Sequence, residues 1–169
     1  MTESETSFAK FSSAETADIT KVSQVRQRVL RHQKMFDRGA PYGISELAFF
    51  LIVDVLAKRG FSLAAASHIA NHCSVTVADF AVDIWAEANG TAPLRGSQDM
   101  PRFLAYTLPT SGRPRAFQLE KLQQGSPPFD DDQDLVPAHV VLDFKCLGEQ
   151  IATAAEKPLV LSNEVSGNG

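Results

Sequence analysis

The segment from Glu46 to Arg59 places the strongest constraint on how this chain can fold. Ser45 is a favourable N-cap before it and Gly60 a favourable stop after it, so the segment is predicted to be a helix. Its apolar side chains cover almost the whole helical circumference: Leu47, Phe49, Phe50, Leu51, Ile52, Val53, Val55 and Leu56. A helix that is apolar nearly all round is either buried or in contact with a partner. The rest of the fold is therefore expected to surround it.

The length of the apolar run in this helix also limits which class of protein the chain can be. Its longest apolar run, Leu47 to Val53, is far shorter than the roughly 20 residues that cross a bilayer. The chain has 169 residues, of which 44% are hydrophobic and 21% charged, so one globular core is expected. The first residues lack the pattern of an export signal, and Cys73 and Cys146 are interpreted as thiols. We expect a cytoplasmic protein.

Positive charge is concentrated before that helix. The whole chain carries a net charge of −4, which alone argues weakly against a nucleic-acid partner. Residues 21–38, however, contain a single acid, Asp37, and six basic side chains: Lys21, Arg26, Arg28, Arg31, Lys34 and Arg38. Because the local field decides what binds, this segment is a candidate for nucleic-acid contact.

Two shorter helices are predicted around the basic segment. Ser12 and Glu15 have the spacing of a capping box, which predicts a helix from Ser13 to about Thr20. Ser23 is a good N-cap for a second helix from Gln24 to about Phe36. Two helices joined by a short turn, the second longer and more basic, have the arrangement of a helix-turn-helix.

The second of these helices is predicted to have two chemically different faces. Val25, Val29 and Leu30 form an apolar stripe that is expected to face the core. The other face is cationic and rich in amides: Gln24, Gln27, Arg28 and Arg31. Such a face suits duplex DNA, because Arg binds guanine, Gln binds adenine, and cations neutralise phosphate. A solvated basic helix is the alternative if the helix is judged without its neighbours.

The order of short motifs resembles the MerR-like DNA-binding families. The residues Ile19-Thr20-Lys21-Val22-Ser23 match the turn before the recognition helix, residues 42–47 match the helix start that follows a short wing, and Gly60-Phe61-Ser62-Leu63 match a following corner. The resemblance covers about a third of the chain and implies a winged helix-turn-helix in residues 11–73. Lys21 stands where these families often have Gly, so a left-handed backbone there would cost roughly 1 kcal/mol.

The resemblance also implies a set of DNA contacts. At or near the major groove it places Ser23, Gln24, Gln27, Arg28 and Arg31, with Arg26 and Lys34 on phosphates. The wing region contains Arg38 and Tyr42, and a flanking phosphate could be held by Lys58 and Arg59. For Tyr42, packing against the helix from Glu46 to Arg59 stays open as an alternative.

The remaining chain is predicted to add a connecting helix and a small α+β module. A helix from Leu63 to about His72 is followed by a connecting helix in residues 74–92, which has Trp85 on its apolar side. The module, residues 93–161, is expected to have strands over 102–108, 115–122 and 139–144 and a helix over about 146–155. Residues 1–10 and 162–169 are expected to be disordered.

Other chemistries receive less support from the sequence. His68 and His72, with Cys73 adjacent, have the spacing of metal ligands, but no second cluster completes a site. A calcium-loop pattern that begins at Asp130 fails at its sixth and twelfth positions, which are apolar. Phosphate-binding glycine loops and nucleophile motifs are missing from the sequence. We therefore expect a protein that is not an enzyme and that uses neither a metal nor a cofactor.

Together these patterns predict a mainly α protein in which a MerR-like winged helix-turn-helix precedes a connecting helix and a small α+β C-terminal module. The predicted function is sequence-specific binding of double-stranded DNA in transcriptional regulation. Two alternatives remain: a phage-type architectural DNA-binding protein, such as an excisionase or packaging protein, and a protein-interaction module that has lost DNA affinity. A homodimer or protein partner could use the helix from Glu46 to Arg59, the Trp85 helix or the C-terminal module.

Overall fold

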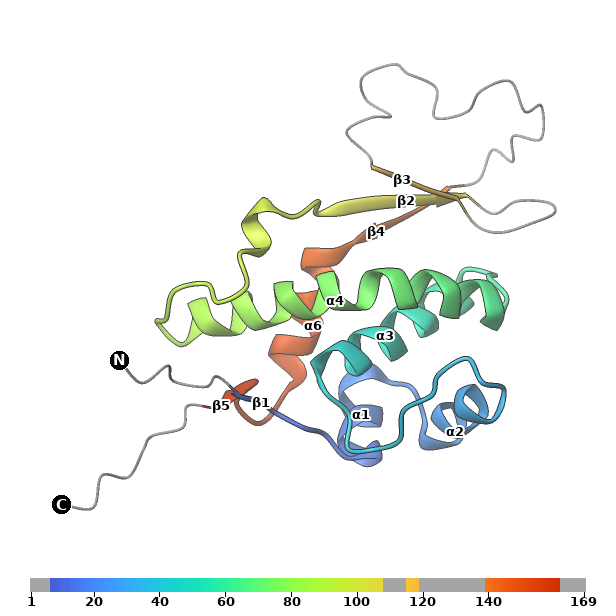
Figure 1. The fold of residues 1–169 in the computed structure, drawn as a ribbon, viewed down its shortest axis with the longest axis horizontal. Helices are drawn as coiled ribbons and strands as arrows, with labels where there is room; N and C mark the ends of the chain where they lie inside the picture. The colour runs from blue at the N-terminus through green and yellow to red at the C-terminus, as the bar shows by residue number, and fades with distance from the viewer. Residues whose placement is uncertain (1–6, 108–114, 119–138, 162–169) are drawn as a thin grey trace.

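The computed structural model describes residues 7–107, 115–118 and 139–161. Within these residues the protein is mainly helical with a small strand part in two sheets, which confirms the expected class (Figure 1). In chain order the elements are β1 (Ser7–Phe8), α1 (Ser13–Thr20), α2 (Gln24–His32), α3 (Ile44–Lys58), α4 (Leu63–Ala88), the 3-10 turn η1 (Ser97–Asp99), β2 (Phe103–Thr107), β3 (Arg115–Gln118), β4 (His139–Asp143), α6 (Phe144–Ala154) and β5 (Val160–Leu161). No helix among them is both long enough and apolar enough to span a membrane.

Helices α1 and α2 begin at the residues that the capping pattern predicts. Ser12 and Glu15 form a reciprocal capping box, in which the amide of each donates to the side chain of the other. The hydroxyl of Ser23 accepts a hydrogen bond from the amide of Arg26 at 3.3 Å. Between the helices, Lys21 has the left-handed φ of 61° that costs a non-glycine residue roughly 1 kcal/mol. The helix, turn and helix therefore follow the predicted order.

Helix α2 is shorter than the sequence pattern indicates. It ends at His32, because Lys34 takes a left-handed φ of 54° and the chain then turns back. The amide of Met35 donates to the carbonyl of Leu30, which closes the helix end. Phe36, predicted as the last helical residue, instead lies buried in the core.

Helix α3 is the centre of the core. Its apolar circumference is covered by α1, α4 and α6, all from the same chain. At its N-terminal half, Phe49 and Phe50 pack with Phe36 and Tyr42, with a centroid distance of 4.8 Å between Phe36 and Phe49 and 5.1 Å between Tyr42 and Phe50. The prediction that this helix could meet a partner is therefore wrong, because the protein itself buries it.

Helix α4 is one continuous helix where the sequence pattern predicted two. Thr76 and Asp79 have the spacing of a capping pair, but Thr76 lies inside the helix. The buried positions continue without a break through Cys73 and Val77 to Ala81, so burial of one long stripe outweighs the local cap. The connecting helix is thus the second half of α4.

Helix α6 packs into the same core and lies close to α4. A Cβ atom on Gly148 would lie 2.8 Å from both the amide nitrogen of Ala81 and the Cβ of Phe80, closer than side chains tolerate. Glycine at this position lets the two helices approach. The apolar side of the second half of α4 is therefore covered by the C-terminal part of the same chain.

The two ends of the described chain are joined by a short sheet. β1 pairs with β5 in antiparallel register, Ser7 opposite Leu161 and Phe8 opposite Val160. Disorder was expected over residues 1–10, and this prediction is wrong for residues 7–10. Residues 1–6 and 162–169 lie outside the described part of the chain.

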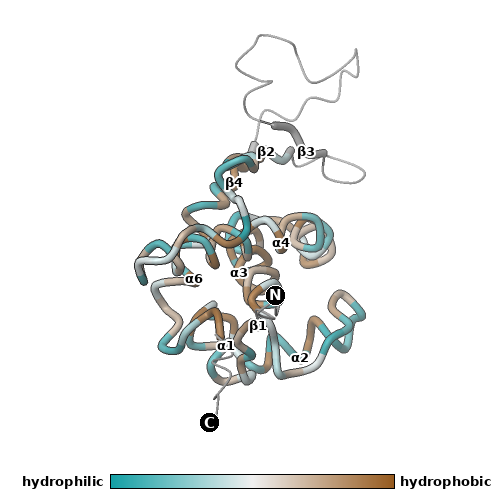
Figure 2. Tube along the Cα trace, turned by 60° about the vertical axis from the view of Figure 1, so that its left-hand side comes forward, coloured by the Kyte–Doolittle hydropathy of each residue, from teal (hydrophilic) through white to brown (hydrophobic). Residues whose placement is uncertain are grey.

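The second sheet has the strand order β3-β2-β4, with both outer strands antiparallel to β2. It lies on the opposite side of α4 from α2 (Figures 1 and 2). Tyr106 of β2 connects the sheet to α4, because its hydroxyl lies 2.7 Å from the sulfur of Cys73. Burial raises the pKa of the Cys73 thiol, which favours its neutral form. The loops expected between these strands fall in residues that the structure does not describe.

Candidate nucleic-acid interface

Helix α2 lies at the edge of the molecule, next to α1 (Figures 1 and 2). Leu30 is completely buried and Gln27 is 1% exposed, and these two side chains fix the inward face of the helix. The side chains on the other half of the helix are exposed: Gln24, Val25, Arg28, Val29 and His32. The outward half thus combines polar, cationic and apolar groups.

Gln27 faces inward, which corrects its predicted position at the major groove. Its amide nitrogen donates to the carbonyl oxygens of Ser13 at 3.1 Å and Val22 at 2.9 Å. A side chain held in this way cannot reach a base in this conformation. Gln27 instead fixes α2 to the start of α1 and to the turn between the helices.

Val25 and Val29 face outward, which corrects the predicted apolar stripe. They are 67% and 37% exposed, whereas Leu30, the third member of that stripe, is buried. The sequence pattern placed valines inside because they are apolar. The two hydrogen bonds of Gln27 hold the side of the helix that carries Gln27 and Leu30 against α1, so the valine side faces outward.

The predicted groove residues Ser23, Gln24, Arg28 and Arg31 are not equally accessible. Gln24 and Arg28 are exposed, and within the described residues Arg28 makes no ion pair. Ser23 is occupied as the N-cap. Arg31 is half-buried beside Gly39, and its Nε atom is buried without a hydrogen-bond partner in the described part of the protein. Gln24 and Arg28 are therefore the polar groups best placed to contact a ligand.

Three of the cations predicted to contact DNA, two on phosphates and one in the wing, are in ion pairs with buried carboxylates of α3. Arg26 lies 3.6 Å and Lys58 2.5 Å from Asp54, whose side chain is 6% exposed. Arg38 pairs with Glu46, which also accepts a hydrogen bond from the amide of Gly43. These cations hold the ends of α3 and their charge is partly compensated.

Tyr42 is the second predicted DNA contact whose position the structure corrects. Tyr42 is 1% exposed and lies in the aromatic cluster, so it is a core residue rather than a wing contact. Its backbone exchanges two hydrogen bonds of 2.7 Å with Phe11, the one strand-like pairing in residues 33–43. Lys34 is exposed, while Arg59 is exposed at the end of α3 and donates to the carbonyl of Val55.

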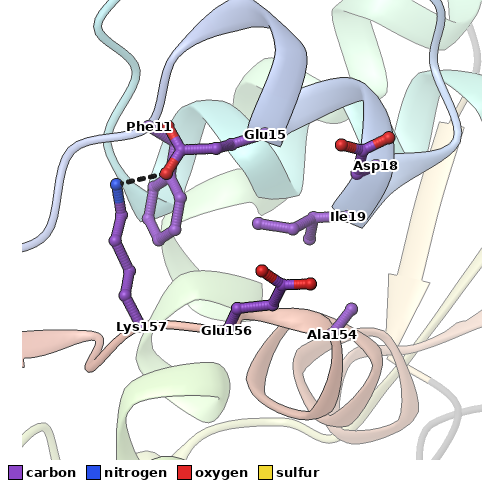
Figure 3. Close-up of a pocket in the computed structure, with 7 residues that line it drawn as sticks. All are labelled: Phe11, Glu15, Asp18, Ile19, Ala154, Glu156 and Lys157. Carbon is purple, nitrogen blue, oxygen red and sulfur yellow. Dashed lines mark hydrogen bonds and ion pairs between the residues drawn. The ribbon is translucent and has the colours of Figure 1, made fainter.

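A pocket of about 300 Å³ lies between α1 and the segment after α6 (Figure 3). Its walls carry Glu15, Asp18 and Glu156, with Lys157 as the cation. Lys157 lies 2.6 Å from Glu15, and together with the amide of Ser12 it lowers the pKa of Glu15 to about 2. The acidic walls of the pocket would repel DNA. The pocket is therefore not part of the candidate interface.

The three residues with the spacing of metal ligands do not converge. His68 and His72 are exposed with ring centroids 4.7 Å apart, but Cys73 is buried against Tyr106. Among the residues that the structure describes, no group of three or more His, Cys, Asp or Glu side chains could hold a metal ion.

No family model matches the chain, and a search of curated proteins finds no match either.

Proposed function

We propose that this protein binds double-stranded DNA through the outward half of α2 and acts as a sequence-specific transcriptional regulator. The observation that carries the proposal is the position of Arg28 and Gln24 on an exposed helix at the edge of the molecule. Arg and Gln are the side chains that bind guanine and adenine edges bidentately. A helix of this width fits the major groove.

The charge around α2 supports the same proposal. Lys21 precedes the helix and Lys34 follows it, and both are exposed. Asp54 faces two cations, Arg26 and Lys58, so this cluster retains net positive charge after pairing. Cations therefore lie before, within and after the helix, where they can contact the phosphates on both sides of a DNA groove. Contacts to the DNA backbone require this arrangement.

The order of elements supports a finer proposal, that residues 11–73 form a MerR-like helix-turn-helix. α1, a tight turn at Lys21 and α2 follow one another, and the segment after α2 returns to pair Tyr42 with Phe11. The wing of this proposal is a single backbone pairing, because residues 33–43 contain no hairpin. The wing cation is then Arg38, whose side chain is 75% exposed despite its ion pair.

A salt titration of DNA binding tests the proposal. Fluorescence anisotropy with a labelled duplex of random sequence measures the dissociation constant between low and moderate salt. The wild-type protein is expected to bind with a steep negative dependence of log affinity on log salt concentration, about 0.9 per phosphate contacted. Absence of binding at low salt, or binding that does not change with salt, would overturn the proposal.

Arg28→Ala and Lys145→Ala form a matched pair for this measurement, because each removes one exposed positive charge. Lys145 lies on α6 and outside the proposed interface. We expect Arg28→Ala to weaken binding to a duplex selected from a random library with the wild-type protein by at least about tenfold, the effect of losing one base-contacting Arg. Lys145→Ala should bind like the wild type. Equal effects of the two substitutions would mean that α2 is not the binding element.

A further inference from the structure

Two exposed valines on α2 have no role in the core. In the described residues the large hydrophobic side chains that are exposed are few, and α2 contributes Val25 and Val29. Exposed alone, a valine needs no explanation. Here the two valines are four residues apart on one short helix, and in an α-helix this spacing places both on the same side, one turn apart.

The valines lie beside the polar groups that the proposed function uses. At 3.6 residues per turn, the Val25–Val29 column is adjacent to the Gln24–Arg28 column. Leu30 and Gln27 occupy the inward side, so both columns face outward together. A surface broad enough to contact both columns, such as the walls of a DNA groove, would meet Arg28 and the methyl groups of the valines together.

We propose that Val25 and Val29 determine specificity by contacting the 5-methyl groups of thymines next to the bases that Gln24 and Arg28 contact. This inference rests on the proposed function. The thymine methyl is the apolar group that a base pair presents in the major groove, and contact with apolar side chains distinguishes it from the other bases. Residues four apart along a helix are separated by about 6 Å, which approaches two base-pair steps of about 3.4 Å.

The composition of this face favours DNA over a protein partner as the occupant. On the outward half of α2 the valines share the surface with Arg28, and exposed Lys21 lies just before the helix, whereas a protein interface usually has an apolar centre with few charges. A duplex supplies both required properties, negative phosphates for the cations and isolated methyl groups for the valines. Charge complementarity therefore favours thymine-containing duplex DNA as the ligand of the outward half of α2.

Replacement of thymine by deoxyuridine tests the inference, because it removes the methyl group and keeps the base pairing. Duplexes are first selected from a random library with the full-length wild-type protein. The best duplex is then synthesised with thymine or with deoxyuridine, and both dissociation constants are measured. We expect deoxyuridine to weaken wild-type binding by about four- to fifteenfold, as for loss of one or two buried methyl groups.

The variant Val25→Ala/Val29→Ala should distinguish the two duplexes less than the wild type does, because it lacks the γ-methyl groups of both valines. Val141→Ala is the control: Val141 is also an exposed valine, but it lies in β4 on the other side of the molecule. This control should keep the full preference for thymine. Circular dichroism and thermal unfolding of each variant confirm that the fold is retained.

The possible outcomes separate this inference from the proposed function. If no duplex is enriched and none binds, both proposals fail. If the wild type binds a selected duplex but does not distinguish thymine from deoxyuridine, or if that duplex has no thymine, DNA binding stands and the role of the valines is wrong. The same conclusion follows if the double variant keeps the thymine preference.

Discussion

The side-chain amide nitrogen of Gln27 lies 2.9 Å from the carbonyl oxygen of Val22, across the turn that joins α1 and α2. A second hydrogen bond from the same nitrogen reaches Ser13. Together they determine which half of α2 faces solvent. A glutamine that sequence reasoning assigns to DNA thus orients the helix that presents Arg28.

Gln27→Ala is expected to destabilise the protein by about 1–3 kcal/mol, because it removes the side-chain donor to one buried and one part-buried carbonyl. Gln24→Ala is the matched control, since Gln24 is exposed on the same helix and its loss should change stability by less than about 0.5 kcal/mol. Urea unfolding curves of both variants measure the difference. Equal stability of the two variants would contradict the orienting role of Gln27.

Gly148→Ala should destabilise the protein by about 1–3 kcal/mol through overpacking between α6 and α4. Alanine normally favours a helix over glycine by about 1 kcal/mol, so the sign of the effect tests the close contact. Gly39→Ala is the control, because its new Cβ would meet Arg31 at an ordinary 3.5 Å. A Gly148→Ala protein as stable as the wild type would mean that the helices are not so close.

Asp83 organises the chain between α4 and β2. Its carboxylate accepts hydrogen bonds from the amides of Leu94 and Arg95 at 2.7 Å and of Ser97 at 2.8 Å. Burial alone would raise the pKa of Asp83, but these hydrogen bonds outweigh burial and lower the pKa. Asp83→Ala should therefore cost roughly 3 kcal/mol in the free energy of unfolding.

Glu87→Ala is the control for Asp83→Ala, because Glu87 is an exposed acid on the same helix. Its loss should change the denaturation midpoint little. Chemical unfolding followed by the fluorescence of Trp85 compares the two. The account of Asp83 is wrong if both variants unfold at the wild-type midpoint.

Stability should depend on pH through Glu15. Lys157 and the capping box lower the pKa of Glu15 from about 4.5 to about 2. The folded state is then stabilised above pH 4.5, and this contribution is lost as the pH falls through 4.5 toward 2. The wild type should unfold at a higher temperature than Glu15→Gln at pH 7, and the difference should shrink at pH 3. A difference that is constant over this range would contradict the assignment.

Sequence patterns predicted those features that depend on neighbours in the chain. Ser12 and Ser23 cap helices as expected, because a cap is formed by residues two or three positions apart. The apolar circumference of residues 46–59 predicted a buried helix for the same reason. No distant residue was needed for either prediction. Ser45, expected to cap the next helix, instead lies inside α3, whose N-cap is Gly43.

Features that depend on distant contacts were missed. The break expected near Thr76 does not occur, because burial of α4 against α3 and α6 outweighs a weak cap. The inward turn of Gln27 requires the carbonyl of Ser13, and the exposure of Val25 follows from it. A sequence pattern contains no information on these contacts, so it assigned the faces of α2 by polarity alone.

The amide chemical shifts of the ¹⁵N-labelled protein, measured during titration with a duplex, test DNA binding through α2 most directly. The account predicts that the largest shift changes occur at Gln24, Val25 and Arg28, with smaller changes near Lys21 and Lys34 and almost none in β2 and β4. Changes confined to the β2–β4 sheet or α6, or no changes at all, would contradict it.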